Sequence, residues 1–317
     1  EFDYPTADAE ETIVIQESGV DADTAARLVK IAEKVRNLRT LDLNNNVLTG
    51  TLPTEIAHLG AALGFGVGSG GPEGTVHIDI SHNNLTGFIP SEIGYLENIQ
   101  NLDLSANPNL GMTEGGNQAL NPGLPTQIGL LSNLKALSLD HCGFSGTVPT
   151  QVGGLRSLQH FLLRGTTLGL EAVTNRFSGT IPTQVGKLSD VMHFGLGDNR
   201  ISGTIPPQIG GMVMLRRFEL QENQLTGSMP DAFKDLGKLE YWDTYGNQMT
   251  GDLPESIQNA TSLGELYIQS AHTDVLRTFR CRQRIPGVGN LQNALNVPSK
   301  QAGIKYNWYV QVAEYYK

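Results

Sequence analysis

Apolar residues recur at a fixed interval along most of this chain. Nine positions align as equivalents, and five of the eight intervals between them are 24 residues long. The other three intervals, of 37, 35 and 33 residues, equal 24 plus an insertion. The aligned anchor positions are Leu41, Ile78, Leu102, Leu137, Phe161, Phe194, Phe218, Trp242 and Leu266. Such a period predicts a solenoid in which each repeat forms one coil.

The pattern inside each repeat predicts which segments are extended and which are helical. A second apolar residue follows two positions after most anchors, as Leu43 follows Leu41, and this alternation predicts a short strand with one buried face. A glycine-x-apolar-proline step then recurs, as at Gly50 and Pro53. Apolar residues three and six positions beyond the proline, beginning with Ile56, predict a short helical or 3₁₀ segment on the convex side.

A small polar residue stands five positions after each of the first eight anchors. The column contains Asn46, Asn83, Asn107, Cys142, Thr166, Asn199, Asn223 and Asn247. A side chain of this kind satisfies backbone groups where the chain turns out of the strand. Because Cys142 occupies this slot, we expect it to be structural, and we expect the neighbouring His141 to point outward. The pair is then neither a metal site nor an activated nucleophile.

The repeats resemble a known family. The stretches LDLNNNVLTGTLPTEI, IDISHNNLTGFIPSEIGYL and FELQENQLTGSMP are similar to the plant-type leucine-rich repeat, xLxLxxNxLxGxIPxxIGxL, over roughly residues 35–270. The resemblance implies an α/β solenoid, a curved right-handed superhelix with a parallel β-sheet on the concave face and short 3₁₀ or helical segments on the convex face. It also implies binding, usually outside the cell, and no enzymatic activity.

The sequence departs from that family at its ends. Plant-type ectodomains usually carry paired cysteines in their terminal caps, whereas the two cysteines here, Cys142 and Cys281, lie in very different parts of the pattern. No transmembrane segment or kinase domain follows the repeats, so we expect no receptor role.

Three regions are expected. Residues 1–38 form an amino-terminal arm and capping helix, residues 39–270 a solenoid of about nine coils, and residues 271–317 a carboxyl-terminal cap with a terminal strand. Residues 21–38 have helical spacing, while residues 11–18 and 304–317 alternate like strands. Insertions near residues 64–75, 111–123 and 169–176 are rich in glycine or polar residues and should be surface loops.

The composition narrows the classes of function. A formal net charge of −10 and a pI near 5.2 argue against a nucleic-acid-binding protein, whose surface should be basic. No apolar run is long enough to span a bilayer. Two sequons, at Asn84 and Asn259, permit N-glycosylation in a secretory pathway. We therefore expect a secreted or cell-surface protein that needs no cofactor.

Residues that face out of the concave strands are the candidate binding surface, because the register directs them away from the core. These candidates are His77, Asp79, His82, Asp103, Asp140, His141, His160, Arg164, His193, Arg217, Glu219, Tyr241, Asp243, Tyr245 and Tyr267. The tyrosines, together with Trp308, are the expected anchors. The expected partner is a protein, a peptide or a glycan.

Two groups on this face raise the question of a metal. His160 and His193 lie on adjacent coils, about 4.8 Å apart, but a zinc site needs three or four convergent ligands. Asp42, Asp79 and Asp103 form a like-charge ladder that costs on the order of 1 kcal/mol per neighbouring pair in water. Hydrogen bonds from adjoining residues or a cation such as calcium would relieve it. The adjoining residues are Thr40, His77 and Asn101. We predict no metal site.

The two ends carry opposite charges. Residues 1–23 contain eight acidic residues and no lysine or arginine, and residues 277–317 contain seven basic residues and one acidic residue. These ends are either local caps or the two halves of a head-to-tail contact that builds a filament or surface matrix. The candidate assembly residues are Arg277, Arg280, Arg282, Arg284, Tyr306 and Trp308.

Overall fold

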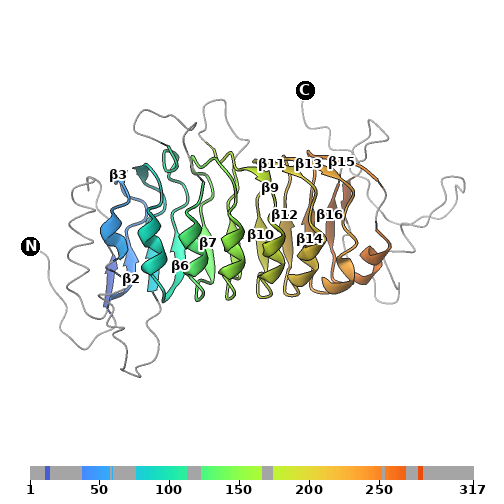
Figure 1. Cartoon of the computed structure of the whole chain (residues 1–317), viewed down its shortest axis with the longest axis horizontal. Helices are drawn as coiled ribbons and strands as arrows, with labels where there is room; N and C mark the ends of the chain where they lie inside the picture. The colour runs from blue at the N-terminus through green and yellow to red at the C-terminus, as the bar shows by residue number, and fades with distance from the viewer. Residues whose placement is uncertain are drawn as a thin grey trace, which may run out of the picture.

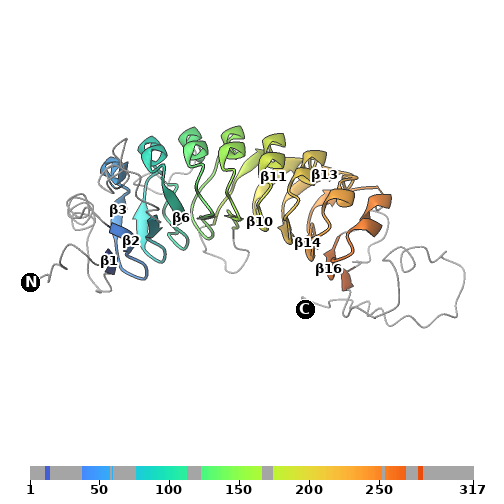
Figure 2. The ribbon, with the colours of Figure 1, turned by 90° about the horizontal axis from the view of Figure 1, so that it is seen from below.

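The computed structural model describes residues 11–14, 38–57, 59, 76–112, 123–165, 174–251, 254–268 and 278–280. In these ranges the chain forms one stacked arc, with strands on the inner side and short helices on the outer side (Figures 1 and 2). The expected helix over 21–38 and the expected terminal strand over 304–317 lie outside the described residues.

An eleven-stranded sheet lines the concave face. All neighbouring strands pair in parallel except the last two, β16 and β17, which are antiparallel. In order, the strands are β1 (Glu11–Val14), β2 (Leu38–Asp42), β4 (Val76–Asp79), β6 (Ile99–Asp103), β7 (Ala136–Ser138), β8 (His160–Leu162), β10 (His193–Gly195), β12 (Arg217–Glu219), β14 (Tyr241–Asp243), β16 (Glu265–Tyr267) and β17 (Thr278–Arg280).

Short 3₁₀ helices cover the convex side, as the apolar spacing predicts. They are η1 (Thr54–Ile56), η2 (Ser91–Tyr95), η3 (Thr126–Leu130), η4 (Thr150–Gly154), η5 (Thr183–Lys187), η6 (Pro207–Gly211), η7 (Phe233–Asp235) and η8 (Glu255–Asn259). In all but η7 the residue before the helix is the repeat proline, whose fixed φ directs the chain into the turn.

Smaller sheets flank the arc between the concave strands and the 3₁₀ helices. One contains β9 (Ser178–Thr180), β11 (Arg200–Gly203), β13 (Gln224–Gly227) and β15 (Gln248–Met249), and another pairs β3 (Thr49–Thr51) with β5 (Asn84–Thr86). The repeat glycine is required here. Gly203 has a φ of +75°, and a Cβ built on it would lie 2.8 Å from Cγ2 of Thr180 in the preceding coil.

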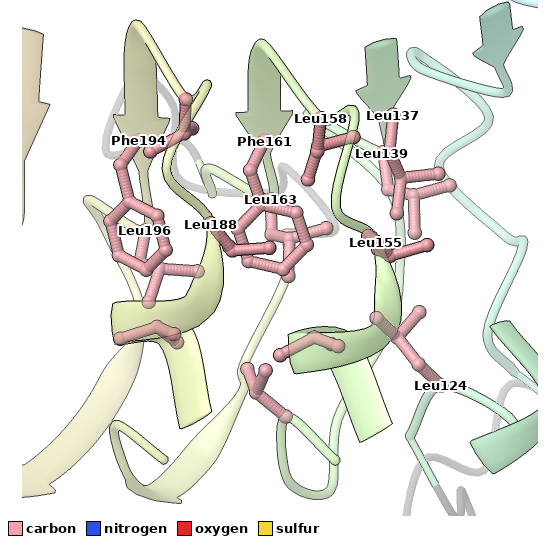
Figure 3. Close-up of a cluster of buried hydrophobic side chains, with 14 of the residues drawn as sticks. Leu124, Leu137, Leu139, Leu155, Leu158, Phe161, Leu163, Leu188, Phe194 and Leu196 are labelled. Atoms are coloured by element: carbon pink, nitrogen blue, oxygen red, sulfur yellow. The ribbon is translucent and has the colours of Figure 1, made fainter. Parts of the chain in front are cut away.

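The anchor residues all belong to one hydrophobic core cluster. Figure 3 shows the part of it around Leu137, Phe161 and Phe194. Ring centroids lie 5.4 Å apart for Phe161 and Phe194, 5.5 Å for Phe194 and Phe218, and 4.4 Å for Phe218 and Trp242. Burying each large apolar side chain contributes about 1.5–3 kcal/mol, so this stack is a major source of stability. The register predicted from the sequence places all of these anchors in the core.

The polar column forms a buried hydrogen-bonded ladder. Oδ1 of Asn223 accepts from the backbone N–H of Ile201 at 2.8 Å, and its Nδ2 donates to the carbonyls of Leu196 and Leu220 at 2.9 and 3.2 Å. Asn83, Asn107, Asn199 and Asn247 make the same kinds of bond, so these asparagines join neighbouring coils where the strands end.

Cys142 fills this slot in its own coil, as predicted. Its side chain is fully buried, and Sγ donates to the carbonyl of Leu104 at 3.2 Å. Burial raises the pKa of the thiol to about 12, so it is an inert structural group at neutral pH. The adjacent His141 is exposed, and a positive φ of 57° turns it outward.

The expectation that Thr166 continues the ladder is wrong. Asn175 occupies that position, since its Oδ1 accepts from the N–H of Phe144 at 3.1 Å and its Nδ2 donates to the carbonyl of Leu139 at 2.7 Å. The extra residues of this coil are inserted before the ladder asparagine, so they leave its register intact.

The expected insertion boundaries also change. Residues 174–176 belong to the coil, because Asn175 is buried and the N–H of Arg176 bonds to the carbonyl of Phe144. At the second insertion Met112 is buried and Gly123 bridges to Thr147, so these positions are part of the solenoid rather than a surface loop. Residues 64–75 lie outside the described part of the chain.

Candidate functional site

The concave sheet places the candidate binding residues in columns, because equivalent residues of successive strands pair directly. His160, His193, Arg217 and Tyr241 are consecutive partners on β8, β10, β12 and β14. Glu219 and Asp243 form the next column, together with Tyr267. His82 and His141 lie beyond the ends of their strands, where the chain turns and each residue has a positive φ.

Glu219 is the centre of a side-chain network on β8–β14. Three neighbours surround its carboxylate: Nε and Nη2 of Arg217 donate to Oε1 at 3.1 and 2.7 Å, Nη1 of Arg164 donates to Oε2 at 3.0 Å, and Nε2 of His193 lies 3.0 Å from Oε2. The side chain of Glu219 is only 6% exposed. A buried carboxylate is stable here because positive and polar groups pair with both of its oxygens.

These contacts fix the ionisation state of Glu219. Burial alone would raise the pKa of its carboxyl, but the close contact with His193, the hydrogen bonds from Arg217 and the charge on Arg164 outweigh burial and lower the pKa from 4.5 to about 2. Glu219 is therefore a carboxylate throughout the physiological range, and it holds the three cationic or polar side chains in place.

Arg164 connects coils that are not adjacent. Its Nε and Nη2 donate to Oδ2 of Asp140 at 2.9 and 2.6 Å, while Nη1 reaches Glu219 two strands away. The side chain passes over Gly195, where a Cβ would lie 3.3 Å from both Cγ and Cδ of the arginine. The role of Gly195 was missed from the sequence. The available signal was the pair Gly195 and Gly197 in one coil, at two positions where the other coils carry larger side chains.

Arginine and tyrosine side chains stack next to this network. The guanidinium carbon of Arg217 lies 4.3 Å from the ring centroid of Tyr241, and the rings of Tyr241 and Tyr267 are 5.5 Å apart. Each hydroxyl donates to a carboxylate two positions away on its own strand: Tyr241 to Asp243 at 3.0 Å and Tyr267 to Glu265 at 2.7 Å. Both residues remain half-exposed.

Asp243 is buried among these groups. Burial raises its pKa to about 6, and the charges of Glu219 and Asp198 act in the same direction, although hydrogen bonds from Tyr241 and the N–H of Tyr245 oppose them. Burial and the Asp243 charge likewise raise the pKa of Tyr241, which keeps its hydroxyl protonated as a donor.

The aspartate ladder at the amino-terminal half is relieved in a way that we did not expect. Oδ1 of Asp79 accepts from the backbone N–H of Ser81 at 2.9 Å, and Oδ1 of Asp103 accepts from that of Ser105 at 2.9 Å. Asp42 does the same with Asn44, at 3.1 Å. The expected donors are not used: His77 instead pairs with Asn101, with 2.7 Å between Nδ1 and Nδ2. These carboxylates lie at strand ends, where backbone N–H groups stabilise them.

His160 and His193 are neighbours, with ring centroids 6.5 Å apart in an edge-on arrangement. Burial and the nearby His193 lower the pKa of His160, which favours its neutral form. Within the described ranges, no three His, Cys, Asp or Glu side chains are grouped so that they could hold a metal ion.

Other candidates are placed only in part. Asn84 and Asn259 are both exposed, in β5 and η8. Of the assembly candidates, Arg280 is the last residue of β17. Arg277, Arg282, Arg284, Tyr306 and Trp308 lie outside the described residues.

Comparison with known families finds the leucine-rich repeat. The family model described as Leucine Rich Repeat matches residues 75–96, 133–155 and 214–236. None of the helices in the described ranges has the length and apolar character needed to cross a membrane.

Solved structures of plant receptor ectodomains share the fold. The leucine-rich repeat ectodomain of the Arabidopsis thaliana receptor kinase GASSHO1/SCHENGEN3, solved in complex with Casparian strip integrity factor 2, is 29% identical with a TM-score of 0.59. The match covers 73% of this chain and 24% of that one. The Arabidopsis receptor kinase HAESA, solved with the peptide hormone IDA and the co-receptor SERK1, is 23% identical with a TM-score of 0.59, covering 76% and 35%. The chain thus spans about a quarter to a third of these structures.

The amino-terminal segment has a different similarity. Residues 10–62 match the family model CbbQ/NirQ/NorQ C-terminal. Protein CbbQ from Hydrogenophilus thermoluteolus is 44% identical over 52 residues, which is 16% of this chain and 20% of that protein. This likeness extends only into the first coil, and the three leucine-rich repeat matches lie in the solenoid beyond it.

Proposed function

We propose that this plant-type leucine-rich repeat protein binds a protein or peptide partner on its concave face, outside the cell, without catalysing a reaction. The observation that carries the proposal is the network on β8–β16, in which half-exposed rings and an exposed guanidinium are held by internal hydrogen bonds to Glu219, Asp243 and Glu265. Side chains fixed before binding lose little conformational entropy when a partner docks.

The chemistry of the patch supports recognition. Tyrosine and arginine dominate the binding energy of many protein interfaces, and Arg217 and Tyr241 lie together at the middle of this patch. The buried acids are already paired with protein donors, so the network gives no sign of a catalytic acid–base pair. The likeness to the GASSHO1/SCHENGEN3 ectodomain, solved with a bound factor, supports an extracellular binding role. A glycan is the alternative class of ligand for the same face.

Selection of displayed random peptides on the immobilised chain tests this proposal. Binders should lose about tenfold or more in affinity, at least about 1.4 kcal/mol, when Arg217→Ala and Tyr241→Ala are combined. Tyr95→Ala is the matched control, because Tyr95 lies in η2 on the convex side and is 67% exposed. Binders that tolerate the concave double variant but not Tyr95→Ala would contradict a concave site.

A further inference from the structure

The amino-terminal half of the concave face is acidic. Asp42, Asp79 and Asp103 stand on β2, β4 and β6 and pair directly from strand to strand. All three are half-buried, so their carboxylates still meet solvent. Their hydrogen-bond donors in the described part of the chain are neutral, namely backbone N–H groups and the side-chain amide of Asn44. The outward positions of these three strands contain no lysine or arginine.

The arginines farther along the concave face are already paired with other acids. Arg164 bonds to Asp140 and Glu219, and Arg217 bonds to Glu219. They therefore do not offset the three aspartates of β2, β4 and β6. A cationic segment lying across these strands would reduce the repulsion between neighbouring carboxylates.

The carboxyl-terminal part of this chain has the complementary charge. Residues 277–317 contain seven lysines or arginines and one acidic residue. The described piece of this part belongs to the concave sheet, because β17 pairs antiparallel with β16 and Arg280 is the direct strand partner of Glu265. One basic residue is thus already placed opposite an acidic residue of the sheet. We call the residues that follow it, 281–317, the basic tail.

The basic tail is long enough to reach the acidic strands. β17 and β6 are seven strand intervals apart in the sheet, which is about 34 Å at 4.8 Å per interval. Lys300 follows Arg280 by 20 residues, and such a length of chain spans about 66 Å when fully extended. Lys300 can therefore reach β6 at little more than half extension, and Lys305 can reach β4 and β2.

We propose that the basic tail docks on the acidic half of the concave face of its own chain, with its lysines against the three aspartates. Because β17 fixes the start of the tail on the same sheet, the contact is intramolecular and has a high effective concentration. A path from β17 to β6 along this face passes over β16, β14 and β12, which carry Tyr267, Tyr241 and Arg217. The tail then covers the proposed partner site and is autoinhibitory. The contact itself stands apart from the proposed function, and only its inhibitory effect rests on it.

The acidic residues 1–23 are a second target of the same charge. The order of the strands favours the concave face, because a tail that runs along the sheet from β17 meets β6 three strand intervals before it reaches β1. Docking on the amino-terminal acids of another copy would in addition require a second molecule, whereas the tethered contact is independent of protein concentration.

Carbodiimide cross-linking of the full chain tests the contact, because this reagent joins a lysine amine to a carboxylate only when the two groups touch. Mass spectrometry of chymotryptic peptides from the monomer band should show Lys300 or Lys305 joined to Asp79 or Asp103. Lys187 is the matched control, since it is exposed in η5 on the convex side and should give no such product. At about 1 M salt, where charges are screened within about 3 Å, the yield should fall at least about threefold.

Charge reversal in the tail tests the inhibitory effect. Lys300→Glu combined with Lys305→Glu changes no described residue, and circular dichroism confirms that the variant is folded. Selected peptides that need Arg217 and Tyr241 should bind it about tenfold more tightly than they bind the wild type. Asp79→Asn combined with Asp103→Asn keeps an oxygen for the N–H groups of the strand ends and should raise affinity in the same direction.

Three results would overturn the contact: no product of Lys300 or Lys305 in the monomer band, products found only in a dimer band, or products confined to residues 1–23. The second would assign the tail to another copy, and the third to the amino-terminal acids. Cross-links without any gain of peptide affinity in the charge-reversed variant would remove the autoinhibitory role. Failure of the proposed function looks different, because selected peptides would then ignore Arg217 and Tyr241 while the cross-links remained.

Discussion

Nη1 of Arg164 donates to Oε2 of Glu219 at 3.0 Å, although 55 residues separate them. The intervening strand β10 makes this contact possible, because Gly195 has no side chain to block the path. A bond across two strand intervals fixes three coils relative to one another, which gives the concave patch a defined shape. The positions of the exposed side chains in the concave patch therefore depend on Gly195, which has no side chain to contact a partner.

Gly195→Val tests this dependence. The added side chain would push Arg164 away and leave the buried Glu219 with fewer partners, so we expect the free energy of unfolding to fall by about 1–3 kcal/mol. Urea denaturation measures the change. Gly237→Val is the control, since a Cβ at Gly237 meets nothing within 4 Å. If the two substitutions lower the free energy of unfolding equally, the path of Arg164 over Gly195 has no special role in stability.

The asparagine ladder predicts that removing one small side chain lowers the stability of the fold considerably. Asn223→Ala removes an acceptor for the N–H of Ile201 and donors to two buried carbonyls, so we expect a loss of about 2–4 kcal/mol. The exposed neighbour provides the control, Gln224→Ala, which should change stability by less than about 0.5 kcal/mol. Thermal and urea unfolding of both variants compare them directly. If Asn223→Ala lowers stability no more than the control does, water replaces the hydrogen bonds of the lost side chain.

Asp243 predicts a pH dependence with a definite sign. Its pKa is raised from 3.8 to about 6, so the folded state holds the proton more tightly than the unfolded state. Its contribution to stability is therefore complete below pH 3.8 and is lost as the pH rises through about 6. The difference between 3.8 and about 6 corresponds to an upper bound of about 3 kcal/mol on this contribution.

Asp243→Asn removes this titration and keeps one of the two oxygens, so it preserves an acceptor for either the Tyr241 hydroxyl or the N–H of Tyr245. Relative to the wild type, the variant should therefore gain stability between pH 4 and pH 7. Urea midpoints and slopes at four pH values measure the free energies. Parallel pH profiles for the two proteins would contradict the raised pKa.

Glycosylation tests the proposed extracellular location at two positions. Asn84 and Asn259 are exposed, and a glycan on either would extend into solvent. Secretion from a eukaryotic host should yield a protein whose mass falls on treatment with a glycosidase, with one step lost in each of Asn84→Gln and Asn259→Gln. Thr86→Ala and Thr261→Ala, which remove the sequons but keep the asparagines, should act identically. A secreted protein of unmodified mass would disprove both sites.

The head-to-tail alternative makes a separate prediction. The sheet ends in β1 at one edge and in β17, with Arg280, at the other, and these strands are where a second copy would continue the sheet. If the basic end docks on an acidic end, negative-stain micrographs should show filaments that dissolve when Arg277, Arg280, Arg282 and Arg284 are changed to glutamate. Curved monomers that persist at high concentration would remove this alternative.

The sequence alone determined the structure of each coil, because the residue patterns that specify it are local. The 24-residue period, the alternation around each anchor and the polar column fix which side chains turn inward, and they correctly placed Cys142 in the core and His141 in solvent. Direct neighbours across coils, such as His160 and His193, follow from the same register, since equivalent residues of stacked strands must pair.

Tertiary structure decided the contacts that depend on how far a side chain reaches and where an insertion leaves the coil. Periodicity could not show that Asn175 replaces Thr166, because an insertion on either side of the ladder position gives the same interval between anchors. Nor could it show that Asp79 and Asp103 bond to backbone N–H groups, or that Arg164 crosses a glycine to Glu219. Those choices are made by competition among nearby donors and acceptors in space, and a linear pattern does not contain their distances.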